Sequence, residues 1–294
     1  SPPEMSERGP LDVTIVSAAA VTDNNAGTNN ITADELSITS GQIGTAADPI
    51  EFTVDNLTTD SRGSDQFLAE ANDLGSLDLT SGAGDIFLTA GGAISDSDGT
   101  VDIQGTAASV TATNAFGSST NPINTSLNNV EISSATQGVF LTESNSLTIG
   151  GASAAQNGIA AAGVISVTTS NGTLTVAENV SSTGSDITLT AGDSGSAGDN
   201  LDISSGVSIA TTSGNLVLEA GDNITAAAAA SVSANGTVTI TADSGSVDTS
   251  GAITLTDGST VTSTGGSNVD LSATNDISLS ALSTGGAVTV TSTG

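Results

Sequence analysis

The sequence predicts an all-β protein built as a parallel β-helix, with three strands in each coil of about 22 residues. Three observations lead to this prediction. Apolar residues alternate with Ser and Thr in short segments bounded by Gly, Asn or Asp, as in half-buried strands and their turns. In the second half of the chain these segments recur with a regular spacing close to that coil length. In the first half, a longer, 73-residue unit is duplicated.

The duplicated unit is clearest in a turn sequence. Residues 44–50 (GTAADPI) recur one unit later as residues 117–123 (GSSTNPI). The same shift places Val21 on Ile94 and residues 67–70 on residues 140–143. A unit of this length would fill three slightly longer coils.

In the second half, the apolar residues fall into three predicted columns in which one residue of each coil stacks on its counterpart in the next coil. We expect right-handed crossovers between the coils. An antiparallel β-sandwich array is the alternative, because it also places a strand at about every 8 to 12 residues. The predicted columns are Leu201, Ile224, Val247 and Val269; Ile209, Val232, Ile253 and Ile277; and Leu216, Val238, Val261 and Leu282.

The chain divides into three parts. Residues 1–12 are predicted to be a flexible N-terminal tail, 13–150 a β-helix with longer loops that contains the duplicated unit, and 151–294 regular coils continuous with it. All five phenylalanines, and the only basic residue outside the tail, lie before residue 151. If the chain has a recognition surface, it is therefore expected in residues 13–150, and the remainder has the composition of a passive spacer.

Composition excludes most kinds of site. The 294 residues include 32 acidic and two basic side chains but no Cys, His, Trp or Tyr, and the formal net charge is -30. Disulfides, thiol nucleophiles, imidazole bases and ordinary zinc or copper sites are therefore excluded. We expect no enzymatic activity and no required cofactor. The charge would repel nucleic acid and anionic membranes, and the sequence predicts no membrane insertion because no apolar run is long enough to span a bilayer.

Acidic residues in the turns are the candidate metal ligands: Asp96 with Asp98, Asp193 with Asp199, and Asp199 with Asp222. Carboxylates that lie close together in the sequence or one coil apart can bind calcium, which needs several oxygen ligands. The alternative is turn chemistry, because Asp and Asn beside Gly are common in tight corners. Neither an EF-hand loop nor the calcium-binding nonapeptide pattern is present. The candidate ligands are Asp96, Asp98, Asp193, Asp199 and Asp222.

Several phrases resemble the large repetitive exoproteins of Gram-negative bacteria, the filamentous-haemagglutinin-like and autotransporter-like β-helical surface proteins. They are residues 42–57 with their second copy ending at Val130, residues 84–90 (GDIFLTA) and residues 185–192 (SDITLTAG). The resemblance covers nearly the whole chain. It implies a right-handed β-helix, secretion, and a place on a bacterial cell surface.

Two functions from different classes follow from these observations. In the first, the chain is a structural extracellular repeat protein whose subunits stack head-to-tail into a rod, fibre or surface layer. Residues 286–294 still follow the repeat pattern, so they are expected to present an open strand edge to another copy. In the second, the chain is an adhesin stalk or binding module that recognises a polysaccharide or a cell surface through loops in residues 13–150.

Overall fold

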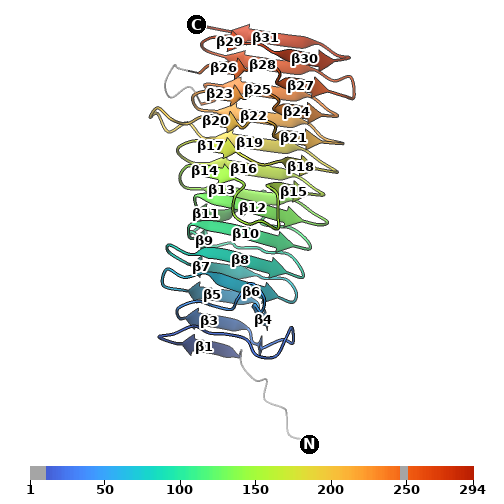
Figure 1. The fold of residues 1–294 in the computed structure, drawn as a ribbon. Coiled ribbons are helices and arrows are strands. Elements are labelled where there is room, and N and C mark those ends of the chain that lie inside the picture. Colours follow the sequence, from blue (N-terminus) through green and yellow to red (C-terminus); the bar gives the residue numbers. More distant parts are fainter. Residues whose placement is uncertain (1–10, 246–250) are drawn as a thin grey trace, which may run out of the picture.

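The chain folds as a β-solenoid. The computed structural model describes residues 11–245 and 251–294, in which the strands stack in about 13 coils of about 22 residues and no helix occurs. Each strand pairs in parallel with its counterpart one coil away, so the predicted parallel β-helix is confirmed and the antiparallel alternative is wrong. β1 (Asp12–Val16) and β31 (Val288–Ser292) lie at opposite ends of the stack (Figure 1). Most of the predicted N-terminal tail, residues 1–10, lies outside the described residues.

One strand from each coil contributes to the first sheet, which has 13 strands. Its members after β1 are β3 (Glu35–Thr39), β5 (Asn56–Asp60), β7 (Ser76–Thr80), β9 (Ile103–Gln104), β11 (Ile123–Ser126), β13 (Val139–Glu143), β16 (Ile165–Thr169), β19 (Ile187–Ala191), β22 (Leu216–Ala220), β25 (Val238–Ala242), β28 (Val269–Ala273) and β31.

The second sheet begins as one column of strands and continues as two. The single column contains β2 (Ile31–Thr32), β4 (Ile50–Thr53), β6 (Gln66–Glu70), β8 (Asp85–Ala90), β10 (Ala107–Ala112) and β12 (Asn129–Ser134). One later column contains β14 (Leu147–Ile149), β17 (Leu174–Val176), β20 (Leu201–Ile203), β23 (Ile224–Ala226), β26 (Ile253–Leu255) and β29 (Ile277–Ser278). The other contains β15 (Ile159–Ala161), β18 (Val180–Ser182), β21 (Ser208–Thr211), β24 (Ser231–Ala234), β27 (Thr260–Ser263) and β30 (Ala281–Thr284).

The number of strands per coil changes at β12. Asn129 and Val130 pair with β14, whereas residues 132–134 pair with β15, so the chain bends between the two halves of this face. From β13 onward each coil has the predicted three strands. Earlier coils have two, because six-residue strands such as β8 and β10 cross the whole face without a bend.

The predicted columns are correct over their first two coils and wrong at the next step, although the later pairs Ile253–Ile277 and Val261–Leu282 stack as predicted. Leu201 pairs with Ile224 as predicted, but Ile224 then pairs with Ile253 and not with a residue of the predicted column. The connection between β25 and β26 is longer than the one between β22 and β23, so a fixed period assigns each later strand to the neighbouring column. Val247 lies outside the described residues. The other observed columns are Ile209, Val232, Val261 and Leu282; and Leu216, Val238, Val269 and Val288.

The duplicated unit spans seven strands rather than the predicted three coils. β4 lies in the second sheet, and its copy, β11, lies in the first. β6 and its copy β13 are divided in the same way. Because the early coils have two strands each, seven strands make three and a half coils. β4 and β6 therefore lie on the opposite sheet from their copies.

Two buried glutamates occupy equivalent positions in the two copies. Glu70, 3% exposed, accepts hydrogen bonds from the backbone N of Val54 and of Asn72, both at 3.0 Å. Glu143, fully buried, repeats these bonds with Leu127 N at 2.9 Å and Asn145 N at 3.0 Å. The Glu143 carboxylate also accepts from the hydroxyls of Thr125, at 2.8 Å, and Ser144, at 3.2 Å. Each carboxylate thus fixes two turns of adjacent coils.

One continuous hydrophobic core runs through the stack. Inward residues such as Leu36, Ile86, Leu189 and Ile240 are almost completely buried, and the residues between them point outward. The burial of these side chains in every coil is the main stabilising contribution, at about 1.5 to 3 kcal/mol for each large apolar side chain. No helix in the described residues has the length and apolar character needed to cross a bilayer.

Candidate functional site

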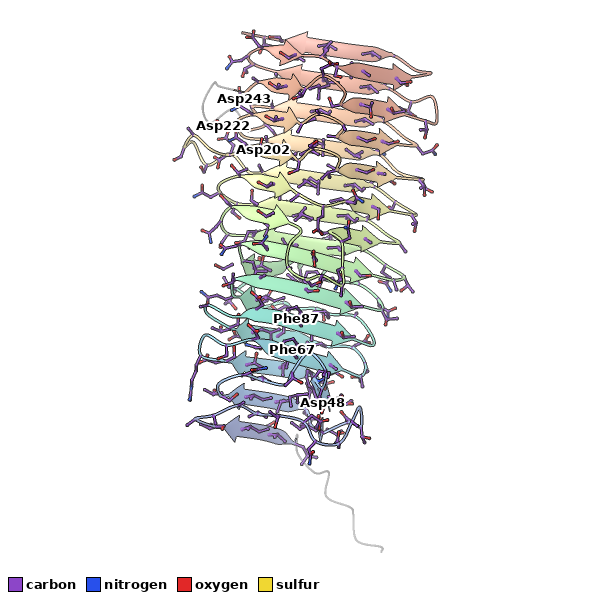
Figure 2. The ribbon with its side chains drawn as sticks, viewed as in Figure 1. Asp48, Phe67, Phe87, Asp202, Asp222 and Asp243 are labelled. Atoms are coloured by element: carbon purple, nitrogen blue, oxygen red, sulfur yellow. The ribbon has the colours of Figure 1, made fainter. Side chains whose placement is uncertain are left out.

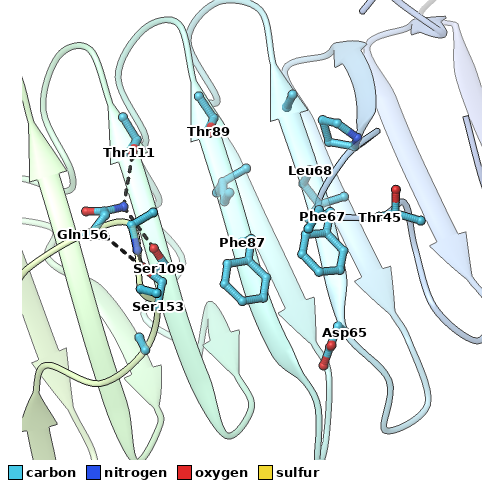
Figure 3. Close-up of a pocket in the computed structure, with 17 residues that line it drawn as sticks. Thr45, Asp65, Phe67, Leu68, Phe87, Thr89, Ser109, Thr111, Ser153 and Gln156 are labelled. Atoms are coloured by element: carbon cyan, nitrogen blue, oxygen red, sulfur yellow. Dashed lines mark hydrogen bonds between the residues drawn. The ribbon is translucent and has the colours of Figure 1, made fainter. Parts of the chain in front are cut away.

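The outer face of the second sheet carries a groove with an aromatic floor. Phe67 of β6 and Phe87 of β8 are directly opposite in the parallel register, and both point outward. Their rings stack with centroids 4.7 Å apart and planes 3° apart (Figure 3). Both side chains are half-buried. The stack is a direct result of the strand spacing, because equal side chains in register lie one strand apart.

Two loops form the walls of this groove, which has a volume of about 800 Å³. Thr45, Ala46 and Pro49 line one end, and the 150–158 loop between β14 and β15 lines the other. Gln156 of that loop donates hydrogen bonds from Nε2 to Ser109 Oγ at 3.0 Å and Thr111 Oγ1 at 3.1 Å, which ties the loop to β10 (Figure 3).

A buried acid holds the base of the 150–158 loop. Glu131, 0% exposed, accepts hydrogen bonds from Gly151 N at 3.1 Å, Ser153 N at 2.8 Å and Ser153 Oγ at 2.8 Å. Glu178 accepts from Gly158 N at 2.8 Å at the other end of the loop. Burial and the neighbouring Glu178 carboxylate raise the pKa of Glu131. The loop is therefore anchored by two acids, and the groove is preformed.

The lining of the groove determines which ligands fit it. Aromatic rings form the floor, hydroxyl and amide groups form the rim, and Asp65 is the only ionisable side chain among the lining residues. A neutral ligand with one apolar face and several hydroxyl groups matches this arrangement. The lining contains no pair of carboxylates and no basic group.

The turn between Ile94 and β9 brings together two of the predicted metal ligands. Asp96, 4% exposed, accepts hydrogen bonds from Ser76 Oγ at 3.1 Å and Asp98 N at 2.8 Å. Asp98 is exposed and accepts from the backbone N and the hydroxyl of Thr100, both at 2.7 Å, and these bonds lower its pKa. The structure adds Asp102, so that one oxygen from each carboxylate lies within 4.8 Å of the other two.

A second acidic cluster occupies the corresponding turns of the first copy. Its members are Asp23, Asp48 and Glu51, with oxygens again within 4.8 Å of one another. Burial and the Asp23 carboxylate raise the pKa of Asp48 and of Glu51. Sequence reasoning missed these residues and Asp102. The signal was the 73-residue shift, which places Asp23 on Asp96.

The other predicted ligands bind backbone groups of neighbouring turns. Asp222 Oδ2 accepts from Gly198 N at 2.5 Å and Asp199 N at 3.0 Å (Figure 2 shows Asp222 beside the coils). Asp199 accepts from Gly172 N at 2.6 Å and from Ser194 N at 2.7 Å, and Asp193 from Gly195 N at 3.0 Å. Burial raises the pKa of Asp199, but the hydrogen bond from the Ser194 hydroxyl, at 2.6 Å, and the two from backbone N outweigh burial and lower it overall. In the described part of the chain these three residues belong to no group of three carboxylates that could share one ion.

No protein-family model, no curated protein and no solved structure matches this chain. The solenoid is consistent with the haemagglutinin-like exoproteins that the sequence resembles, and membership of that class stays a prediction.

Proposed function

We propose that this chain is a structural repeat protein, secreted or held on a bacterial surface, whose solenoids stack head-to-tail into a rod, fibre or surface layer. The observation that supports the proposal is the continuity of the 13-stranded sheet and its single core, which make the described coils one elongated body (Figure 1). A rod of this kind can serve a structural role through its length alone, without a catalytic site.

The inward face of the last described coil is the kind of surface on which a further coil stacks. β31 pairs with β28 on one side, and its inward residues Val288 and Val290 are 48% and 43% exposed. Val269, which pairs with Val288 from the preceding coil, is fully buried. A further coil from a second copy would bury the exposed valines and bond the free backbone groups of β31.

Stacking is tested with two variants of β31 that have the same net charge, one changed on the inward face and one on the outward face. Val290→Lys places a charge on the stacking face, and Thr289→Lys places the same charge on the outward face one residue earlier. In sedimentation and negative-stain microscopy at about 0.15 M salt, the unaltered chain and Thr289→Lys should form filaments or concentration-dependent oligomers, and Val290→Lys should be monomeric. A monomeric unaltered chain contradicts the proposal.

The aromatic groove favours a second function, recognition of a neutral polysaccharide by the rod. Pyranose rings have an apolar face that packs on an aromatic ring, and their hydroxyl groups would reach the hydroxyl and amide groups of the rim. The net charge of -30 disfavours acidic glycans. The groove is in residues 13–150 together with the 150–158 loop, close to where the sequence predicts a recognition surface.

Glycan binding is tested with an internal control. Phe67→Ala and Phe87→Ala should each abolish binding to neutral glycans on an array. Phe140→Ala removes the equivalent ring in the second copy, which is half-buried but pairs with Ser166 on the neighbouring strand, so it should leave binding unchanged. Equal binding by all three variants, or no neutral glycan bound by the unaltered chain, contradicts this function.

A further inference from the structure

The most informative feature outside the groove is the carboxylate of Asp102. Its side chain is buried, with 1% of the residue exposed, and Oδ2 accepts a hydrogen bond from Asn124 N at 2.6 Å. The other oxygen, Oδ1, is buried and has no hydrogen-bond partner. A buried carboxylate oxygen without a donor is costly, so a positively charged partner is expected at this position.

No side chain of this protein supplies that charge in the described residues. Arg62 is the only basic residue there, and its Nη1 donates to the backbone oxygen of Ser17 at 3.2 Å. The charged groups that act on Asp102 are instead Asp96 and Asp98, and the same two carboxylates act on Asp78 of β7. The site therefore gathers negative charge around an oxygen that lacks a partner.

Each copy of the duplicated unit has a cluster of three acids, but the acids do not all occupy equivalent positions. In the first copy, Asn30 Oδ1 accepts a hydrogen bond from Glu51 N at 2.7 Å. In the second, Asp102 takes the place of Asn30, and Asn124 takes the place of Glu51, with the same bond at 2.6 Å. Each of these hydrogen-bonded pairs thus contains one acid and one Asn. The acid is the donor residue in the first copy and the acceptor residue in the second. This hydrogen bond forms with Asn or Asp as the acceptor and with Glu or Asn as the donor residue, so it does not itself require a constant number of carboxylates.

We propose that Asp96, Asp98 and Asp102 form a binding site for one calcium ion. Oxygens bound to the same Ca²⁺ at about 2.4 Å lie at most about 4.8 Å apart, which is the separation these three carboxylates already satisfy. A cleft of about 300 Å³ beside them is lined by Thr120, Asn121 and Asn124, and gives room for further oxygen ligands and water. The available ligand atoms are side-chain oxygens, and the three carboxylates lie outside the strands, which suits Ca²⁺ better than the strict octahedron of Mg²⁺.

Calcium titration calorimetry on the chelator-treated chain at about 0.15 M salt tests the site. Asp98→Asn changes an exposed ligand, and Asp102→Asn keeps the shape and the acceptor for Asn124 N. Asp202→Asn is the control, because it removes one charge from an outward position of β20 far along the chain (Figure 2). Each ligand variant should bind one equivalent fewer of Ca²⁺ than the unaltered chain, or bind that equivalent at least tenfold more weakly, and Asp202→Asn should match the unaltered chain.

Three results would overturn the proposal. The first is equal calcium binding by Asp98→Asn, Asp102→Asn and Asp202→Asn. The second is diffuse calcium uptake that disappears at about 0.15 M salt. The third is that the site lost in the ligand variants binds Mg²⁺ as tightly as Ca²⁺ in the unaltered chain. Circular dichroism of each variant is recorded alongside, and Asp98→Asn keeps the test decisive if Asp102→Asn does not fold, because Asp98 is exposed. The site does not depend on stacking or on glycan binding, so failure of either function leaves this test unaffected.

Discussion

Replacing Glu143 by Leu should destabilise the coils around β13 by about 3 kcal/mol. Four donors point at this carboxylate, and two of them, Leu127 N and the Thr125 hydroxyl, belong to residues that are 3% and 1% exposed. Each buried donor left without a good acceptor costs about 1–3 kcal/mol, so the two together cost about 4 kcal/mol, because Thr142 O lies 3.5 Å from the Thr125 hydroxyl and is too far away to replace the carboxylate. Removing a buried carboxylate whose pKa is raised by burial returns about 1 kcal/mol.

The first copy provides the matched comparison. Phe52 stands where Thr125 stands in the second copy, so Glu70→Leu leaves only one buried donor, Val54 N, without its acceptor. Its cost should be about 1 kcal/mol. Glu35 is exposed on β3, and Glu35→Leu should change stability by less than about 0.5 kcal/mol.

Hydrogen exchange measures these differences coil by coil. In peptides covering residues 123–145, Glu143→Leu should exchange roughly 150-fold faster than the unaltered chain, because about 1.4 kcal/mol corresponds to a factor of ten. Urea unfolding followed by circular dichroism gives the global value. The reasoning is refuted if Glu70→Leu costs as much as Glu143→Leu, or if Glu143→Leu exchanges like Glu35→Leu.

Three further predictions concern the core, a turn and the pH dependence. Val238→Asp buries an unpaired charge in a fully buried position and should cost at least about 4 kcal/mol in urea unfolding, whereas the outward Thr239→Asp should cost less than about 1 kcal/mol. Gly117→Ala should lower the free energy of unfolding by about 2–4 kcal/mol, because the φ of Gly117 is +68° and a Cβ would lie 2.5 Å from Phe140 O. Gly63 has a φ of +90° but open space around it, so Gly63→Ala should cost about 1 kcal/mol. Equal costs for the two variants would contradict the clash. Burial raises the pKa of Glu70 and Glu143 above the ordinary 4.5, so their contribution is complete below that pH and is lost as pH rises through the raised values. In chelator, the unaltered chain should therefore lose more stability between about pH 4 and pH 7 than Glu143→Gln, and parallel pH profiles would show that this carboxyl does not titrate as described.

The sequence carries the strand pattern, the parallel stacking and the coil length, because each depends on local alternation and a repeated period. It does not predict the correct partners across the long connection between β25 and β26, because that connection breaks the period that the columns assumed. The two-strand coils were missed because a six-residue strand and two three-residue strands have similar apolar content. Asp102 was missed because single-residue shifts around it hide its equivalence to Asn30. The aromatic stack was within reach, since the spacing of Phe67 and Phe87 in the sequence is close to the length of one coil.

The half-integral length of the duplicated unit explains why two nearly equal sequences have different surroundings. A copy displaced by three and a half coils lies on the other sheet, so Phe67 lies outward on the second sheet and Phe140 outward on the first. The 150–158 loop lies over the outer face of the second sheet, where its Gln156 bonds to β10. Only the first copy therefore contributes its aromatic ring to a groove with walls. The acidic turns behave differently from the groove. Their carboxylates all come from within the unit, so each copy forms its own cluster of three acids. Features built inside the unit are therefore duplicated, and a feature that needs a neighbouring loop occurs once.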